Sequence, residues 1–232
     1  MIIKKSPEEI EKMAAAGAIH ARTMKIVEAK IREGVSTREL DEAAEKYIRS
    51  QGAVPSFKGY RGFPGSICAS PNAMVVHGIP GNYRLQRGDI LSVDIGVTLD
   101  GWVADGACTF PVGPITPVAE RLLEVTEASL FDAVAQARPG NRLGDISWAV
   151  QSRVEEAGMS VVRTLVGHGV RISGPPEVIA TVNSKCAASE PSWEKIAQPS
   201  PPTRTAGSPA VIIGSTASTM PSSSSGPLPG LP

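Results

Sequence analysis

The 232-residue sequence has few cysteines, no long apolar run and no net charge. Its 23 basic and 23 acidic side chains argue against a dedicated nucleic-acid or membrane-surface binder, which usually carries a basic excess. Cys68, Cys108 and Cys186 form no CxxC pair, so a disulfide framework is not expected and a reducing compartment is the simplest setting. Residues 1–13 contain no signal-peptide core. These absences predict a soluble, cytoplasmic protein that binds neither nucleic acid nor membrane.

The C-terminal part lacks the residues from which a packed core is built. Residues 171–232 hold eleven of the chain's 20 prolines and no aspartate, phenylalanine or tyrosine. Such a composition buries little apolar surface, and only PAVIIG (209–214) resembles a strand there. We therefore expect a folded domain over residues 1–169 and a Pro/Ser-rich, disordered tail over residues 170–232.

The first 169 residues carry alternating helix and strand signals. Ser6 with Glu9, and Ser36 with Glu39, have the spacing of capping boxes, which mark helix starts. We expect helices over 7–32, 37–50, 117–138 and 143–157, loops and short strands over 55–80, and a strand over 160–166. Helices that alternate with strands in this way predict a mixed α/β (α+β) domain.

Two aspartates lie inside a predicted hairpin over residues 91–110. The pair Asp100-Gly101 is a strong signal for a two-residue turn. With that turn Asp94 lies opposite Ala107, and Asp105 projects from the same face as Asp94. The two carboxylates would then be diagonal neighbours, about 7–8 Å apart at the backbone.

These carboxylates have no cation nearby in the sequence, because residues 88–120 contain neither lysine nor arginine. Burying an unpaired carboxylate costs roughly several kcal/mol, so a positive partner from elsewhere is expected. Two carboxylates on one face are typical of a divalent metal site. The alternative is that both face solvent on the polar side of a hairpin, and their spacing alone leaves both interpretations open.

The three histidines bear on this choice. His77 and His168 each follow an apolar, β-branched run and precede a glycine, so each is interpreted as the end of a strand and as a candidate ligand or acid/base group. Each alone also fits a packed structural histidine. His20 lies in the first predicted helix, where we expect a structural or surface role far from the site.

Several motifs together resemble a known family. GYRGFPGSICAS, VVHGIPG, GDILSVDIGVTLDGW, ARPGNRLGDIS and VGHGV stand in this order. Over residues 1–169 the chain resembles the type I methionine aminopeptidases. The resemblance implies the pita-bread fold, here with an incomplete C-terminal half, and removal of the initiator methionine from nascent polypeptides. It further implies a cytoplasmic monomer with the ribosome as a further partner. A proline-specific peptidase of the same fold is a weaker alternative, because those enzymes usually carry a large additional N-terminal domain.

The resemblance also implies roles for single residues. Asp94 matches a ligand of one metal ion, Asp105 the ligand that bridges two ions, and His168 a ligand of the other ion. His77 matches the catalytic histidine that contacts the scissile peptide bond of the substrate. The matches to the methionine side-chain pocket are Phe57, Tyr60, Phe63 and Cys68. Two divalent ions are implied, and cobalt, manganese, iron and zinc would all suit carboxylate and imidazole ligands.

The sequence departs from the family after residue 169. The family's metal site uses two further glutamates and a second histidine downstream of the histidine ligand, whereas this chain has no later histidine. Its later glutamates, Glu177, Glu190 and Glu194, match no family motif. We interpret this change as translation in a shifted reading frame; the alternative is a genuine but diverged tail. We therefore expect an aminopeptidase with an incomplete metal site and impaired activity; the alternative is a catalytically inactive module that binds peptides or the ribosome.

Overall fold

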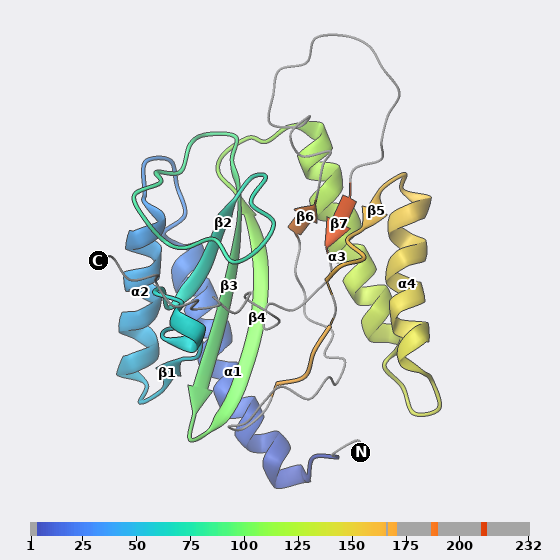
Figure 1. The fold of residues 1–232 in the computed structure, drawn as a ribbon, viewed down its shortest axis with the longest axis horizontal. Coiled ribbons are helices and arrows are strands. Elements are labelled where there is room, and N and C mark those ends of the chain that lie inside the picture. Colours follow the sequence, from blue (N-terminus) through green and yellow to red (C-terminus); the bar gives the residue numbers. More distant parts are fainter. Residues whose placement is uncertain (1–3, 166, 171–186, 190–209, 213–232) are drawn as a thin grey trace, which may run out of the picture.

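A computed structural model describes residues 4–165, 167–170, 187–189 and 210–212 of the chain. Figure 1 shows helices α1 and α2 packed beside one sheet, with a second group of helices and short strands next to it. The elements in chain order are α1 (Pro7–Glu28), α2 (Thr37–Ser50), β1 (Val54–Pro55), η1 (Tyr60–Gly62), β2 (Ile67–Pro71), β3 (Ile90–Leu99), β4 (Trp102–Pro111), α3 (Pro117–Gln136), α4 (Leu143–Glu156), β5 (Ser160–Val161), β6 (Ala187–Ser189) and β7 (Ala210–Ile212). This mixed content confirms the predicted α/β class.

The two N-terminal helices begin at the predicted caps. The Ser6 hydroxyl accepts a hydrogen bond from the Glu9 N–H, and the Glu9 carboxylate accepts one from the Ser6 N–H at 2.8 Å. Ser36 starts α2 in the same way. Helix α1 ends at Glu28, short of the predicted residue 32. The Ala29 N–H still bonds four residues back to Lys25, but the N–H groups of Lys30 and Ile31 bond three residues back, in a tightened final turn.

Strand β3 is the centre of the first sheet. It pairs antiparallel with β4 along one edge and with β1 and β2 along the other. Asp100 and Gly101 have φ angles of 48° and 82°, which suit a two-residue hairpin turn. The resulting register sets Asp94 opposite Ala107 and Asp105 opposite Gly96. The predicted hairpin register is therefore confirmed, and the two aspartates share one face of the sheet.

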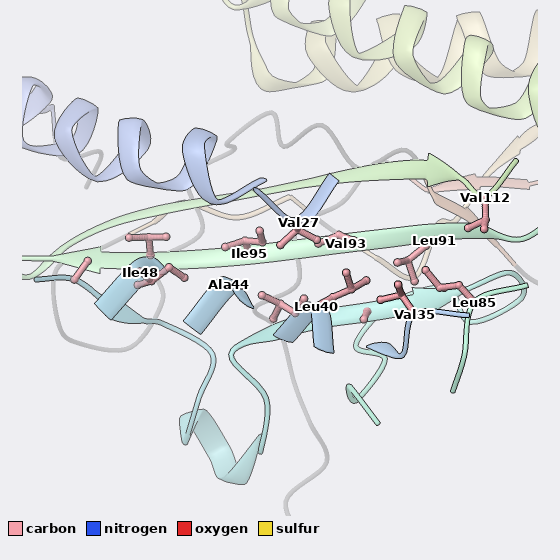
Figure 2. Packing of buried hydrophobic residues seen from close by; sticks show 14 residues of the cluster. Val27, Val35, Leu40, Ala44, Ile48, Leu85, Leu91, Val93, Ile95 and Val112 are labelled. Atoms are coloured by element: carbon pink, nitrogen blue, oxygen red, sulfur yellow. The ribbon is translucent and has the colours of Figure 1, made fainter. Parts of the chain in front are cut away.

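The rear face of this sheet carries the main hydrophobic core. Alternate residues of β3 are fully buried and belong to one cluster with residues of α1 and α2 (Figure 2). They are Leu91, Val93, Ile95 and Val97 on the strand, and Val27, Leu40, Ala44 and Ile48 on the helices. Since successive side chains of a strand alternate between its faces, the aspartates lie on the opposite, front face.

The second group of elements is built around a helix pair. Helices α3 and α4 share a core that includes Leu122 and Val154. Strand β7 lies in PAVIIG, the one segment of the tail that resembles a strand in the sequence, and pairs with both β5 and β6. Strand β6 was not predicted, because Ala-Ala-Ser has little β preference. Strand β5 ends at Val161, five residues before the predicted end, because the chain turns at residues 163–164.

The limit of the folded domain stays a prediction, since most of residues 170–232 lie outside the described part of the chain. Within that described part, no helix is both long enough and apolar enough to cross a membrane.

The loop between β2 and β3 is anchored by the buried carboxylate of Asp89. This carboxylate accepts hydrogen bonds from Asn72 Nδ2 at 2.7 Å, from the Tyr83 hydroxyl at 2.8 Å and from the Gln86 N–H at 2.8 Å. Burial, followed by the hydrogen bond to Asp89 and its negative charge, raises the pKa of Tyr83 to about 12. The network closes the loop at its base.

His77 occupies a strained position in this loop. Its φ angle of 60° is one that residues other than glycine rarely adopt. The following residue, Gly78, is fastened to β2: its N–H donates to the Ser70 hydroxyl at 3.0 Å, and its carbonyl accepts from the Ala69 N–H at 2.9 Å. A Cβ on Gly78 would lie 2.2 Å from the Ala69 carbonyl oxygen, so only glycine fits there. The anchored glycine fixes the backbone on the C-terminal side of His77.

Alkaline pH should weaken the anchor of this loop. Because folding raises the Tyr83 pKa from 10 to about 12, its contribution to stability is complete below pH 10 and is lost as pH rises towards 12. We expect the urea-unfolding free energy of the parent chain to fall more steeply between pH 10 and 12 than that of Tyr83→Phe. Tyr60→Phe, which changes an exposed tyrosine, should follow the parent. Equal slopes for parent and Tyr83→Phe would contradict the assignment.

The strain at His77 predicts an unusual order of stabilities. Both His77→Gly and His77→Ala remove the imidazole, but only alanine retains a Cβ in the left-handed backbone conformation. We expect the unfolding free energy of His77→Gly to exceed that of His77→Ala by about 1 kcal/mol, measured by urea denaturation. A glycine variant no more stable than the alanine variant would show that this backbone conformation carries no strain.

Candidate functional site

The front face of the β2–β3–β4 sheet is polar, yet it is buried. Asp94 is only 2% exposed, and the side chain of Asp105 only 4%. This excludes the interpretation in which both carboxylates face solvent. The face was visible in the sequence as an alternation along β3, where small and polar residues fall between the core residues. Three further polar members pair across the strands beside the aspartates and are also buried: Ser70, Ser92 and Thr109.

His168 lies beside Asp105, as the sequence predicted. Its Nε2 is 3.9 Å from Asp105 Oδ2, and both side chains are almost fully buried. The other ring nitrogen, Nδ1, lies 2.9 Å from the Gly169 carbonyl oxygen. Since a carbonyl can only accept, Nδ1 must donate its hydrogen there, which leaves Nε2 on the side of the carboxylate. This is the orientation that a metal-binding histidine requires.

Two of the four residues predicted for the methionine pocket lie on the same face. Cys68 pairs with Asp94 across the β2–β3 ladder and is 4% exposed. The Phe57 ring covers Gly96, where an added Cβ would lie 2.7 Å from Phe57 Cε1. Gly96 is in turn the partner of Asp105 in the ladder. A sulfur atom and an aromatic ring therefore flank the two carboxylates.

The other two predicted pocket residues differ from each other. Phe63 is buried, at 5% exposure. Tyr60 is 44% exposed, and the Arg61 guanidinium lies 5.5 Å from the centre of its ring in a cation–π contact. Tyr60 is therefore not enclosed in the described structure.

The sequence predicted that His77 and His168 each end a strand, and the structure differs on this point. Neither His77 nor His168 ends a strand: His77 lies in the β2–β3 loop, and His168 lies in irregular chain after β5. The strand interpretation was wrong because the run before His77 lies in the loop, and the run before His168 forms only the short strand β5 before the chain turns at residues 163–164. The anchored Gly78 nevertheless keeps His77 one residue from a contact with β2.

The expectation that His20 lies far from the site was also wrong. His20 Nε2 is 3.1 Å from the carbonyl oxygen of Gly106, the residue directly after Asp105. His20 reaches this carbonyl from α1, on the rear face of the sheet. Sequence reasoning missed the contact because 86 residues separate the partners and nothing local links them.

The donors have the right chemistry for a divalent ion, but few of them come together. Two carboxylates and an imidazole are ligand types that such ions accept. Asp105 and His168 are in contact, whereas the described residues contain no group of three or more His, Cys, Asp or Glu placed to hold a metal. Asp94 shares the face without completing such a group. The later glutamates Glu177, Glu190 and Glu194 lie outside the described residues.

A hollow of about 610 Å³ lies elsewhere, between α3 and α4. Its lining includes Asp132, Trp148 and Arg153 but none of the predicted site residues. The Asp132 carboxylate is already bound by Arg153 at 2.6 Å. We therefore assign the site to the front face of the sheet and not to this hollow.

Comparison with known proteins shows that the chain is similar to metallopeptidases. Residues 11–196 match the model of metallopeptidase family M24. Methionine aminopeptidase 1 of Bacillus subtilis is 53% identical over 170 residues, which cover 73% of this chain and 68% of the relative. Methionine aminopeptidase of Clostridium perfringens is 48% identical over 180 residues, covering 77% of this chain and 72% of the relative. These relatives favour the predicted aminopeptidase over the non-catalytic binding module.

Solved structures agree on the fold. Methionine aminopeptidase from Rickettsia prowazekii superposes with a TM-score of 0.73 at 36% identity, covering 80% of this chain and 76% of that one. A prolidase from Pyrococcus furiosus gives a TM-score of 0.65 at 22% identity, covering 72% of this chain and 49% of that one, and supports the fold alone. The pita-bread fold is thereby confirmed. With the family match over residues 11–196 and these close relatives, the chain belongs to metallopeptidase family M24, in its methionine aminopeptidase branch.

Proposed function

We propose that this chain is built to release the N-terminal methionine from nascent polypeptides in the cytoplasm, with divalent metal ions as cofactors. The contact between Asp105 and His168 on a buried face that also carries Asp94 supports this proposal best. The names of the relatives point to the same reaction and the same substrate class. The proposal includes that the protein acts as a monomer and that it contacts the ribosome.

The two aspartates and His168 would hold the cation. The carboxylates supply two negative charges in a segment without lysine or arginine, and the His168 ring is neutral when its Nε2 lone pair is used. A bound divalent ion would supply a Lewis acid for the peptide carbonyl and a more acidic water. Burial keeps competing water away from these donors and strengthens their electrostatic attraction to a cation.

The flanking residues would hold the substrate. Phe57 and Cys68 offer an aromatic ring and a polarizable sulfur beside the carboxylates, and Phe63 adds a buried aromatic ring. Such surfaces suit the thioether of a methionine side chain. His77, held by the anchored Gly78, would donate a hydrogen bond to the peptide group and stabilise negative charge that develops on it.

We further propose that turnover by this chain is low. Two ions carry four positive charges, whereas the donors named above carry two negative ones. With so few donors, one ion would be held weakly and the free amine of the substrate would lack an anchor. Loss of the residues that support metal ligands lowers metal affinity or activity by about 10–100-fold, and loss of the ligands themselves should lower them at least as much.

The test measures methionine release from a Met-Ala-Ser peptide with added manganese or cobalt. We expect the 232-residue chain to turn over at least about 100-fold more slowly than the Bacillus subtilis relative assayed alongside. Comparable turnover, abolished by Asp105→Ala, would refute the incomplete site and make Glu190 and Glu194 the next residues to mutate.

A chimera provides the matched control. Replacing residues 171–232 with the corresponding C-terminal segment of the Bacillus subtilis relative should raise turnover by at least about tenfold if that segment supplies missing ligands. Asp105→Ala in the chimera should remove the gain. A folded chimera that stays inactive would show that residues 1–170 themselves cannot support the reaction.

A further inference from the structure

His20 reaches the catalytic strand from the rear of the sheet. It lies in α1, half-buried, and its Nε2 is 3.1 Å from the Gly106 carbonyl oxygen on β4. A carbonyl oxygen can only accept, so Nε2 must carry the hydrogen in this bond. The bond ties the helix that covers the rear face to the strand that carries Asp105 on the front face.

The packing of the His20 ring against Gly106 is also close. A Cβ on Gly106 would lie 2.8 Å from His20 Cε1 and 3.1 Å from Nε2. The imidazole therefore occupies the space into which a side chain at position 106 would project. Glycine at 106 and histidine at 20 fit each other, because the ring can come this close only to a residue without a Cβ.

A shift of the Gly106 backbone would move the side chain of Asp105 on the front face. Asp105 is bonded directly to Gly106, and successive residues of a strand project to opposite faces. The Asp105 carboxylate lies 3.9 Å from His168 Nε2, and both side chains are 4–5% exposed. A group so enclosed has little room to compensate for a rotated peptide by changing its own rotamer.

We propose that His20 is a positioning residue: its hydrogen bond to the Gly106 carbonyl sets where the Asp105 carboxylate meets His168. Its importance for catalysis rests on the proposed metal-dependent function. The positional effect itself exists without metal and is measured without metal.

Two substitutions separate the hydrogen bond from simple packing. His20→Phe keeps a ring of similar size and removes the donor, whereas His20→Gln keeps a donor and removes the ring. If the hydrogen bond sets the position of Asp105, His20→Phe should displace the Asp105 carboxylate relative to His168, and His20→Gln should leave it in place. A packing role predicts the reverse order.

The metal-free measurement uses isotope-labelled chain and compares the amide resonances of Asp105 and Ala107 and the ring nitrogens of His168. We expect His20→Phe to shift these signals and His20→Gln to keep them close to the parent. Ile19→Ala, which trims a neighbouring α1 residue packed on the main core, should lower the urea midpoint without moving them. Unmoved signals in His20→Phe, or larger shifts in His20→Gln, would overturn the proposal.

The second measurement is cobalt binding, followed by visible absorption. We expect His20→Phe to weaken the cobalt affinity about tenfold and His20→Gln to stay within about threefold of the parent. If the parent binds no cobalt, or if Asp105→Asn binds as tightly as the parent, the proposed metal site fails while the resonance comparison still decides the role of His20. Equal cobalt affinity in parent and His20→Phe would also count against positioning.

Discussion

The two-residue turn at Asp100-Gly101 sets the register of β3 against β4, and the site depends on that register. A slip of one residue would send one aspartate into the hydrophobic core behind the sheet. In the observed register both carboxylates lie on the front face, where Cys68 pairs with Asp94 and the ring of Phe57 covers Gly96, the ladder partner of Asp105. The same register sends Leu91, Val93, Ile95 and Val97 to the rear, where they bury against α1 and α2. One turn therefore gives the sheet a hydrophobic rear face and a polar front face.

Burying carboxylates in this way is unfavourable unless positive charge compensates for it. The segment that carries them has no lysine or arginine, and the fold brings His168 Nε2 to 3.9 Å from Asp105 Oδ2. His168 directs its Nδ1 hydrogen to the Gly169 carbonyl, which leaves Nε2 for the carboxylate side. Carboxylates and an imidazole with this orientation are ligand types that divalent cations accept.

The backbone around the site is held from three directions. Asp89 fastens the base of the loop that carries His77, and Gly78 fastens that loop to β2. His20 contacts β4 from behind, at the residue next to Asp105. The glycines at 78, 96 and 106 each leave space that a neighbouring backbone or ring occupies. Close packing at these three points explains how so small a sheet can hold polar side chains in defined positions.

The sequence by itself determined the local features: the capping boxes that start α1 and α2, the hairpin turn, its register and the shared face of Asp94 and Asp105. Each of these follows from residues within a few positions of one another, where backbone geometry and periodicity act directly. The family was also readable from ordered motifs. The ordered motifs also predicted that His168 lies near Asp105. Only the tertiary structure decided that the front face is buried, that the Tyr60 ring is exposed and that His20 reaches Gly106. These contacts join residues far apart in the chain, and they depend on how helices and sheet pack, which local preference does not specify.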